Sequence, residues 1–209
     1  MKILAISGSL RKDGNSEAYC NMVLEEAKAQ GADVKLISLA GKKLSGCTGC
    51  YSCVQAKKCV VEDDFQVIFQ EIITADGILL ASPVYHSSIT AELKAVLDRT
   101  GFSGRWAMNQ MQNKGDSYVW KGTVMSDKVV APITVARRAG RNFAFAQVLL
   151  WAAANDCIIV GNTYWNVGVA GKGGARDAAD DTEGVGIMKG LAGRMVTVIN
   201  AMKKAGAAT

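Results

Sequence analysis

The stretch "KILAISGSLRKDGNS", residues 2–16, sets the pattern of the fold. An apolar run over residues 2–7 ends in Ser-Gly-Ser, as expected of a strand that is covered on both faces. Asn15 and Ser16 are good helix N-caps, and apolar residues follow them at helical spacing to about Gln30. The stretch therefore predicts a buried strand, a polar loop and a helix in direct succession.

Short apolar runs alternate with longer helical segments along the rest of the chain. Further strands are expected over residues 33–39, 77–82, 128–136 and 157–162. Helices are expected over residues 65–74, 90–101, 142–156 and 180–204, with Gly101 ending the second of them. The alternation predicts an α/β three-layer sandwich, with a five-stranded parallel sheet in the flavodoxin-like order 2-1-3-4-5. Ligands of such a sheet bind at the carboxyl ends of the strands, beside the switch point.

The composition favours one folded domain over residues 1–209. Hydrophobic residues make up 49% of the chain and only two residues are proline. We expect two additions to the sheet: a cysteine-rich loop at 46–64 after the second strand, and a weakly patterned insertion at 102–127. No apolar run approaches the roughly 20 residues that span a bilayer, and the N-terminal run is too short for a signal peptide. We therefore expect a cytoplasmic protein that does not bind membranes.

The charge and the first loop favour an anionic cofactor. The net charge is +5, but the basic residues are scattered and form no stripe interleaved with aromatics, which argues against nucleic acid binding. The loop from Ser7 to Ser16 lies between a strand and a helix, where backbone N–H groups and the helix dipole favour a phosphate. Because it lacks both common nucleotide fingerprints, the monophosphate of FMN fits better than ATP. An ordinary strand-to-helix turn is the alternative.

Two further loops follow strands and carry candidate binding residues. In "SPVYHSS", residues 82–88, Tyr85 could contact a flat ring, and His86 could be a general acid or base or a simple surface residue. In "ARRAGRN", residues 136–142, Gly140 allows close backbone approach and the arginines could face a phosphate or an electron-rich ring. A solvated basic turn is the alternative for this last loop.

Four cysteines lie in "GCTGCYSCVQAKKC", residues 46–59, with the spacing C-x2-C-x2-C-x5-C. Three ligands at two-residue gaps resemble the run that wraps a cubane cluster in bacterial ferredoxins, and Cys59 would have to close the same site. Zinc is a rival metal, although structural zinc usually takes two ligand pairs from separate knuckles. Redox-active thiols, a disulfide or an empty structural segment are the other readings. Cys20 and Cys157 are expected to be buried apolar residues.

The loops together resemble the NAD(P)H-dependent FMN reductase branch of the flavodoxin superfamily, and within it the iron–sulfur flavoproteins. The resemblance rests on Ser7-Gly-Ser with Asn15-Ser16, Ser82-Pro-Val-Tyr85, Leu93-Lys94 with Asp98-Arg99, Ala136-Arg-Arg-Ala-Gly140 and the cysteine segment. It runs from the first strand to the last helix and is weakest over residues 102–127. In these flavoproteins the compact cysteine spacing is associated with a [4Fe–4S] cluster.

The resemblance implies a set of cofactor residues. The FMN phosphate would be bound by Ser7, Ser9, Arg11, Asn15 and Ser16. One side of the isoalloxazine would be lined by Pro83, Val84, Tyr85 and His86, and the other side by Arg137, Arg138, Ala139 and Gly140. The cluster would be held by Cys47, Cys50, Cys53 and Cys59. His86 and Arg141 depart from residues that are frequent in the family, so the role of His86 is not inherited.

These features predict a flavin-dependent oxidoreductase that transfers electrons between a reduced donor and an acceptor through the cluster. NAD(P)H is a candidate donor by resemblance alone, and a ferredoxin-like carrier or a small oxidant is the expected partner. A homodimer or homotetramer is also expected. The alternatives are an NAD(P)H-dependent FMN or quinone reductase without a cluster, and a non-enzymatic flavin-binding redox sensor.

Overall fold

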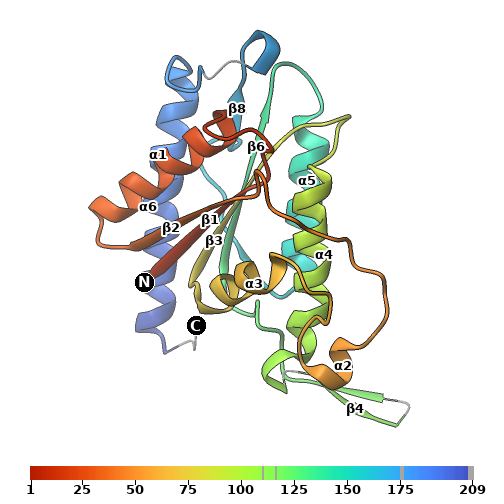
Figure 1. The fold of residues 1–209 in the computed structure, drawn as a ribbon. Helices are drawn as coiled ribbons and strands as arrows, with labels where there is room; N and C mark the ends of the chain where they lie inside the picture. The colour runs from red at the N-terminus through yellow and green to blue at the C-terminus, as the bar shows by residue number, and fades with distance from the viewer. Residues whose placement is uncertain (110, 116, 175–176, 207–209) are drawn as a thin grey trace.

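A parallel sheet forms the centre of the computed structural model, which describes residues 1–109, 111–115, 117–174 and 177–206 (Figure 1). Its strands are β1 (Lys2–Ser7), β2 (Asp33–Ser38), β3 (Gly77–Pro83), β6 (Val129–Ala136) and β7 (Ile158–Ile159). They pair in the order β2-β1-β3-β6-β7, and every pairing is parallel. The predicted fold class is confirmed and these five strands follow the order 2-1-3-4-5, but the described sheet has six strands and not the predicted five, because a further short strand also pairs with β6.

The edge position beside β6 differs from the prediction, because two short strands share it. β7 pairs at Val129, near the start of β6, and β8 (Val167–Val169) pairs from Thr134, near its end. The single strand predicted over 157–162 is therefore wrong in its extent. The side chain of Asn162 donates to the Ile187 carbonyl oxygen at 2.6 Å and accepts from the N–H of Thr163 at 2.8 Å. The bond with Thr163 is local and competes with a strand ladder, whereas the bond with Ile187 joins groups 25 residues apart.

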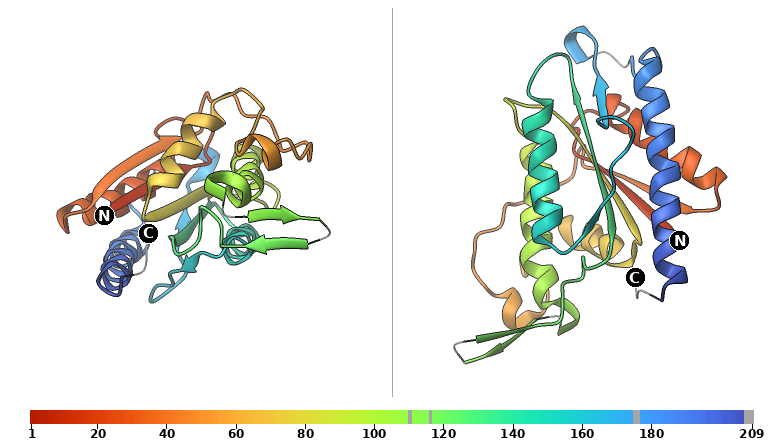
Figure 2. Two further views of the ribbon diagram at one scale, coloured as in Figure 1. Left: turned by 90° about the horizontal axis from the view of Figure 1, so that it is seen from below. Right: turned by 180° about the vertical axis from the view of Figure 1, so that it is seen from behind.

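Two helical layers cover the sheet, as the two views of Figure 2 show. One face carries α1 (Asn15–Ala29) and α6 (Thr182–Lys204). The other face carries α3 (Phe65–Thr74), α4 (Ala91–Trp106) and α5 (Arg141–Ala154). Alternate residues of each strand enter opposite cores, so Ile3 packs under α1 and α6 while Leu4 packs under the other three helices.

Gly101 does not end its helix, contrary to prediction. It lies inside α4, where an added Cβ would be 3.2 Å from Asn155 Oδ1 and 3.5 Å from Trp151 Nε1. The glycine thus allows close packing against α5 and the turn that follows it. The insertion after α4 contains a 3-10 turn, η1 (Ala107–Asn109), and an antiparallel hairpin of β4 (Met111–Lys114) and β5 (Ser117–Trp120).

Two shorter elements lie in the loops, α2 (Cys53–Ala56) and the 3-10 turn η2 (Lys172–Gly174). Among the described residues, none of the helices combines the length and the apolarity required to cross a membrane.

Candidate functional site

A cleft of about 220 Å³ opens at the carboxyl ends of β1, β3, β6 and β8. This is the edge of the sheet at which parallel α/β proteins bind ligands. The predicted residues that line the cleft are Ser9, Arg11, Asn15, Ser16, Pro83, Val84, Tyr85 and Arg137. The structure therefore brings the three predicted loops together around one space.

The phosphate-type loop is shaped by its own hydrogen bonds. Ser9 Oγ accepts from the backbone N–H of Arg11 and donates to the Arg11 carbonyl oxygen, each at 3.1 Å. Gly14 is the N-cap of α1 in extended conformation. The start of α1, with its positive dipole end, consequently faces a cleft that also holds Arg11.

A fourth loop, after β8, also lines the cleft and was missed by the sequence reasoning. Its cleft residues are Ala170, Gly171, Gly173 and Gly174. Arg11 Nη1 donates to the Gly173 carbonyl oxygen at 2.9 Å, and a Cβ on Gly174 would lie 1.8 Å from the same nitrogen. Gly174 has a φ of +74° and leaves room for the guanidinium. The glycine-rich run "GVAGKGG" was the available signal for this loop.

Two of the predicted phosphate residues also make structural hydrogen bonds. Ser7 is fully buried, and its Oγ accepts from the N–H of Ser9 at 3.4 Å. Asn15 borders the cleft, but its carboxamide donates to Asp177 Oδ1 at 2.9 Å and accepts from the N–H groups of Asp177 and Ala178. These residues hold the loops in place around the cleft.

His86 lies on a tight turn and outside the residues that line the described cleft. Tyr85 and Ser88 exchange backbone hydrogen bonds at 2.9 and 3.0 Å, and His86 and Ser87 between them have φ of 49° and 64°. Such paired left-handed residues form the tight turn of a two-residue hairpin. His86 is exposed at its tip.

The rest of the third loop lies beside the cleft. Arg138, Ala139 and Gly140 line an adjoining surface together with Arg141 and neighbouring residues. Gly140 has a φ of +89°, and a Cβ there would lie 3.1 Å from Ser87 Cα and from Val84 Cγ1. The glycine therefore lets this loop pack directly against the Tyr85 turn.

All four cysteines of the motif line a second, small cavity. The lining also includes Tyr51, Arg99, Phe102 and Ser103. Cys53 is buried at the start of α2 and Cys59 is half-buried, whereas Cys47 and Cys50 are exposed. Burial raises the pKa of the Cys53 thiol, and the other three thiols of the motif add to this shift. Hydrogen bonds with Ser52 and Thr48 lower the pKa of Cys50.

The cavity contains the type of ligand that a metal cluster requires, because all four thiols line it. Within the part of the chain that the structure describes, no three His, Cys, Asp or Glu side chains converge closely enough to hold a metal ion. Cys59 is held by Arg99, whose Nε donates to Cys59 Sγ at 3.3 Å. Cys53 lies at the start of α2. A four-thiolate site therefore requires the four thiols to converge more closely than they do among the described residues.

The two remaining cysteines lie elsewhere in the fold. Cys20 is fully buried in α1, as predicted. Cys157 is only partly buried, just before β7, and burial raises its pKa to about 12. Neither thiol is poised to act as a thiolate at neutral pH.

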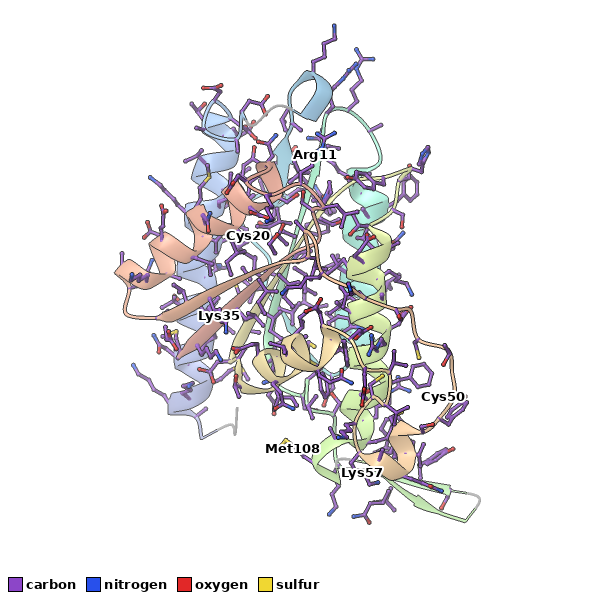
Figure 3. The ribbon with its side chains drawn as sticks, viewed as in Figure 1. Arg11, Cys20, Lys35, Cys50, Lys57 and Met108 are labelled. Carbon is purple, nitrogen blue, oxygen red and sulfur yellow. The ribbon has the colours of Figure 1, made fainter. Side chains whose placement is uncertain are left out.

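The cleft and the cysteine cavity are separated along α4. The helix begins beside the cleft, where Thr90 Oγ1 donates to the Gly8 carbonyl oxygen at 2.8 Å. The cysteine cavity contacts Phe102 and Ser103 near the other end of α4. At about 1.5 Å per residue, Thr90 and Ser103 are about 20 Å apart along the axis. Arg11 and Cys50 accordingly lie far apart in Figure 3.

The sheet order and the cleft define a flavodoxin-like α/β protein. The family model described as NADPH-dependent FMN reductase matches residues 1–172, so the chain belongs to that family. It is accordingly a flavin-dependent oxidoreductase.

Two curated relatives match nearly the whole chain. An iron–sulfur flavoprotein of Methanocaldococcus jannaschii is 30% identical over 98% of this chain and 100% of its own length. An iron–sulfur flavoprotein of Methanosarcina thermophila is 28% identical over 98% of both chains.

Solved structures show the same fold. RosB, with a bound formylriboflavin phosphate, superposes with a TM-score of 0.74 at 14% identity, over 98% of this chain and 81% of its own. FerB of Paracoccus denitrificans, a flavoenzyme NAD(P)H:(acceptor) oxidoreductase, has a TM-score of 0.65 at 15% identity, over 96% of this chain and 97% of its own.

Proposed function

We propose that this protein is an FMN-dependent redox protein that passes electrons between a reduced donor and an acceptor through a [4Fe–4S] cluster. The observation that carries the proposal is that all four cysteines of the motif line one cavity in a chain of the FMN reductase family. The names of the two relatives, both iron–sulfur flavoproteins, support it.

FMN is proposed to lie in the cleft at the carboxyl ends of the strands. When bound, it supplies hydride and single-electron transfer, which joins two-electron donors to one-electron carriers. Arg11, held by the Gly173 carbonyl, offers a fixed positive charge for the phosphate beside the start of α1. Tyr85, which lines the cleft, would offer a flat aromatic face to the ring, and Arg137, from the loop after β6, would contribute a positive charge beside it. Ser7 holds the backbone of Ser9, and Asn15 holds the loop at Asp177 and Ala178.

The cysteine loop is proposed to hold the cluster through Cys47, Cys50, Cys53 and Cys59. Four thiolates are the ligand set that such clusters take, and the cluster exchanges single electrons. Within the chain, Gly49, with a φ of +66°, bends the segment between Cys47 and Cys50. Arg99 and α2 keep Cys59 and Cys53 in place.

The separation of the cleft and the cysteine cavity along α4 affects which partner can complete the electron path. Because the sites lie at opposite ends of one helix, we propose that a second copy of the chain or a ferredoxin-like carrier completes the electron path. NAD(P)H or a small-molecule oxidant would then reach the flavin cleft. A homodimer or homotetramer would bring the cysteine cavity of one protomer toward the cleft of another.

A second candidate is an NAD(P)H-dependent reductase of flavins or quinones that uses the cleft alone. The exposure of Cys47 and Cys50 favours this alternative. A visible spectrum of anaerobically purified protein distinguishes the two. Flavin bands with a broad iron–sulfur absorption that bleaches with dithionite support the cluster. Flavin bands alone with rapid NADPH oxidation support the alternative, and no bound flavin after reconstitution contradicts both.

A further inference from the structure

Arg99 is a buried charged residue next to the cysteine cavity. It lies in α4 with only 1% of its side chain exposed. Its Nη1 donates to both carboxylate oxygens of Asp63, at 2.8 and 2.6 Å, and its guanidinium lies 4.1 Å from the centre of the Phe65 ring. Burying a charged residue is costly unless it is paired and hydrogen-bonded, so these contacts must be kept for the residue to stay buried.

The same guanidinium contacts both ends of the cysteine loop. Nη1 also donates to the Ser45 carbonyl oxygen at 3.2 Å, immediately before the motif. Nη2 donates to the Val61 carbonyl oxygen at 2.9 Å, immediately after it. Asp63 completes the connection, because its Oδ2 accepts from the N–H of Ser45 at 2.8 Å. One side chain from α4 thus closes the loop at its base.

The Nε donor of Arg99 is directed at a thiol. Nε lies 3.3 Å from Cys59 Sγ, in a hydrogen bond from a charged donor to sulfur. Gln66 Nε2 holds the backbone of the same cysteine by donating to the Cys59 carbonyl oxygen at 2.9 Å. Cys59 is therefore fixed at both its backbone and its side chain.

We propose that Arg99 is the positioning residue of the cysteine site: it closes the base of loop 45–61 and holds the Cys59 sulfur beside a fixed positive charge before a cluster binds. The planar guanidinium is required, because a lysine ammonium carries the charge but has no donors in a fixed fork that reach four groups at once. Hydrogen bonds to the cysteine sulfurs are among the features that set cluster potentials. The effect on a cluster rests on the proposed function, whereas the closure of the loop does not.

The first test uses the full chain with FMN bound and iron removed by chelation. Hydrogen exchange of backbone N–H groups over residues 45–61 is compared among wild type, Arg99→Gln and Arg99→Lys. We expect exchange to be at least tenfold faster in both variants. Arg105→Gln is the matched control, because it removes the same charge from the same helix where the guanidinium lies over Trp120. It should leave exchange over 45–61 unchanged.

The second test uses anaerobically reconstituted protein and measures the midpoint potential of the cluster. Loss of a positive charge beside a thiolate disfavours the reduced state, so Arg99→Gln should lower the potential. Arg99→Lys keeps the positive charge, so its potential should lie closer to that of wild type. Its hydrogen exchange over residues 45–61 should still be faster than in wild type. If Arg99→Gln does not fold, hydrogen exchange and the midpoint potential are measured on Arg99→Lys and Asp63→Asn instead.

Several outcomes are decisive. Unchanged exchange in both Arg99 variants would overturn the proposal, whatever the iron content. Faster exchange with an unchanged potential would overturn the role of Arg99 at the Cys59 sulfur and leave only its role in closing the loop. If wild type takes up no iron while its Arg99 variants still exchange faster, the proposed cluster fails and the closure of the loop stands.

Discussion

Arg99 and Asp63 form an ion pair in which Nη1 lies 2.6 Å from Oδ2, with side chains that are 1% and 7% exposed. Removing one partner of a buried pair leaves an uncompensated charge, which costs about 3–5 kcal/mol. We therefore expect Asp63→Asn to lower the free energy of unfolding by about that amount at pH 7, as measured by urea denaturation. Asp64→Asn removes a half-buried carboxylate 3.6 Å from Lys42, while the carboxamide oxygen can still accept from the Lys43 N–H, so it should change the free energy of unfolding by less than about 1 kcal/mol.

The same pair predicts a pH dependence. Burial alone would raise the pKa of the Asp63 carboxyl, but hydrogen bonds from Arg99 and from the N–H groups of Ser45 and Phe65 outweigh burial and lower it. A lowered pKa in the folded state stabilises the protein above the unfolded value of about 3.9, and this stabilisation is lost as the pH falls through the folded pKa. The stability difference between wild type and Asp63→Asn should therefore shrink below pH 4. A constant difference from pH 7 to pH 3 would contradict this account of the pair.

Gly174 should control the position of Arg11. Gly174→Ala places a Cβ 1.8 Å from Arg11 Nη1 and displaces the guanidinium from the cleft. A hydrogen bond to a charged group contributes about 1.5–3 kcal/mol, so FMN affinity should fall roughly ten- to hundredfold in a flavin fluorescence titration. Gly173→Ala is the matched control, because Gly173 has a φ of +72° but nothing within 4 Å of the added Cβ. Equal losses in the two variants would attribute the effect to backbone strain and not to Arg11.

Tyr85 should contribute its ring to flavin binding. The side chain is 45% exposed and lines the cleft. Aromatic pairs contribute about 0.5–1.5 kcal/mol beyond area burial, so Tyr85→Leu should weaken FMN binding roughly two- to tenfold and Tyr85→Phe should not. Tyr118→Leu removes a tyrosine that is 54% exposed from the β4–β5 hairpin and serves as the control. An unchanged dissociation constant in Tyr85→Leu would remove this residue from the site.

Gly168 should fix β8 onto the helical layer of α1. A Cβ at this position would lie 2.1 Å from Tyr19 Cε2, and the Tyr19 hydroxyl donates to Asp181 Oδ2 at 2.6 Å. Overpacking of this kind costs about 1–3 kcal/mol, which calorimetry would detect as a lower melting temperature for Gly168→Ala. Gly161→Ala, with nothing within 4 Å of its Cβ, should melt like wild type. Identical melting of both variants would contradict the packing described.

Much of the fold could be predicted because its central strands are short, fully buried apolar runs. Residues 2–7 and 129–136 show this pattern and form β1 and β6. The extent of the edge strand could not be predicted, because Asn162 Oδ1 accepts from the Thr163 N–H, which a longer strand would use, and its amide donates to a carbonyl of α6. The helix end predicted at Gly101 was wrong, because the sequence alone does not distinguish a glycine that permits close packing from one that ends a helix.

The site was predictable where loops follow buried strands, and less so where contacts are distant in sequence. Arg11 and the Gly173 carbonyl are 162 residues apart, and only the fold brings them together. Arg99 and Cys59 are 40 residues apart, and the "DR" pair in α4 gave no sign by itself of a hydrogen bond to a thiol.

The central claim is that the four-cysteine loop holds an iron–sulfur cluster in a flavoprotein. The most direct test measures iron, acid-labile sulfide and FMN per chain after anaerobic reconstitution of wild type, Cys50→Ser and Cys157→Ser. The account predicts about four irons and four sulfides with one FMN in wild type, loss of iron but not FMN in Cys50→Ser, and wild-type values in Cys157→Ser. Iron content that is the same in wild type and Cys50→Ser, or no iron in wild type with FMN bound, would contradict it.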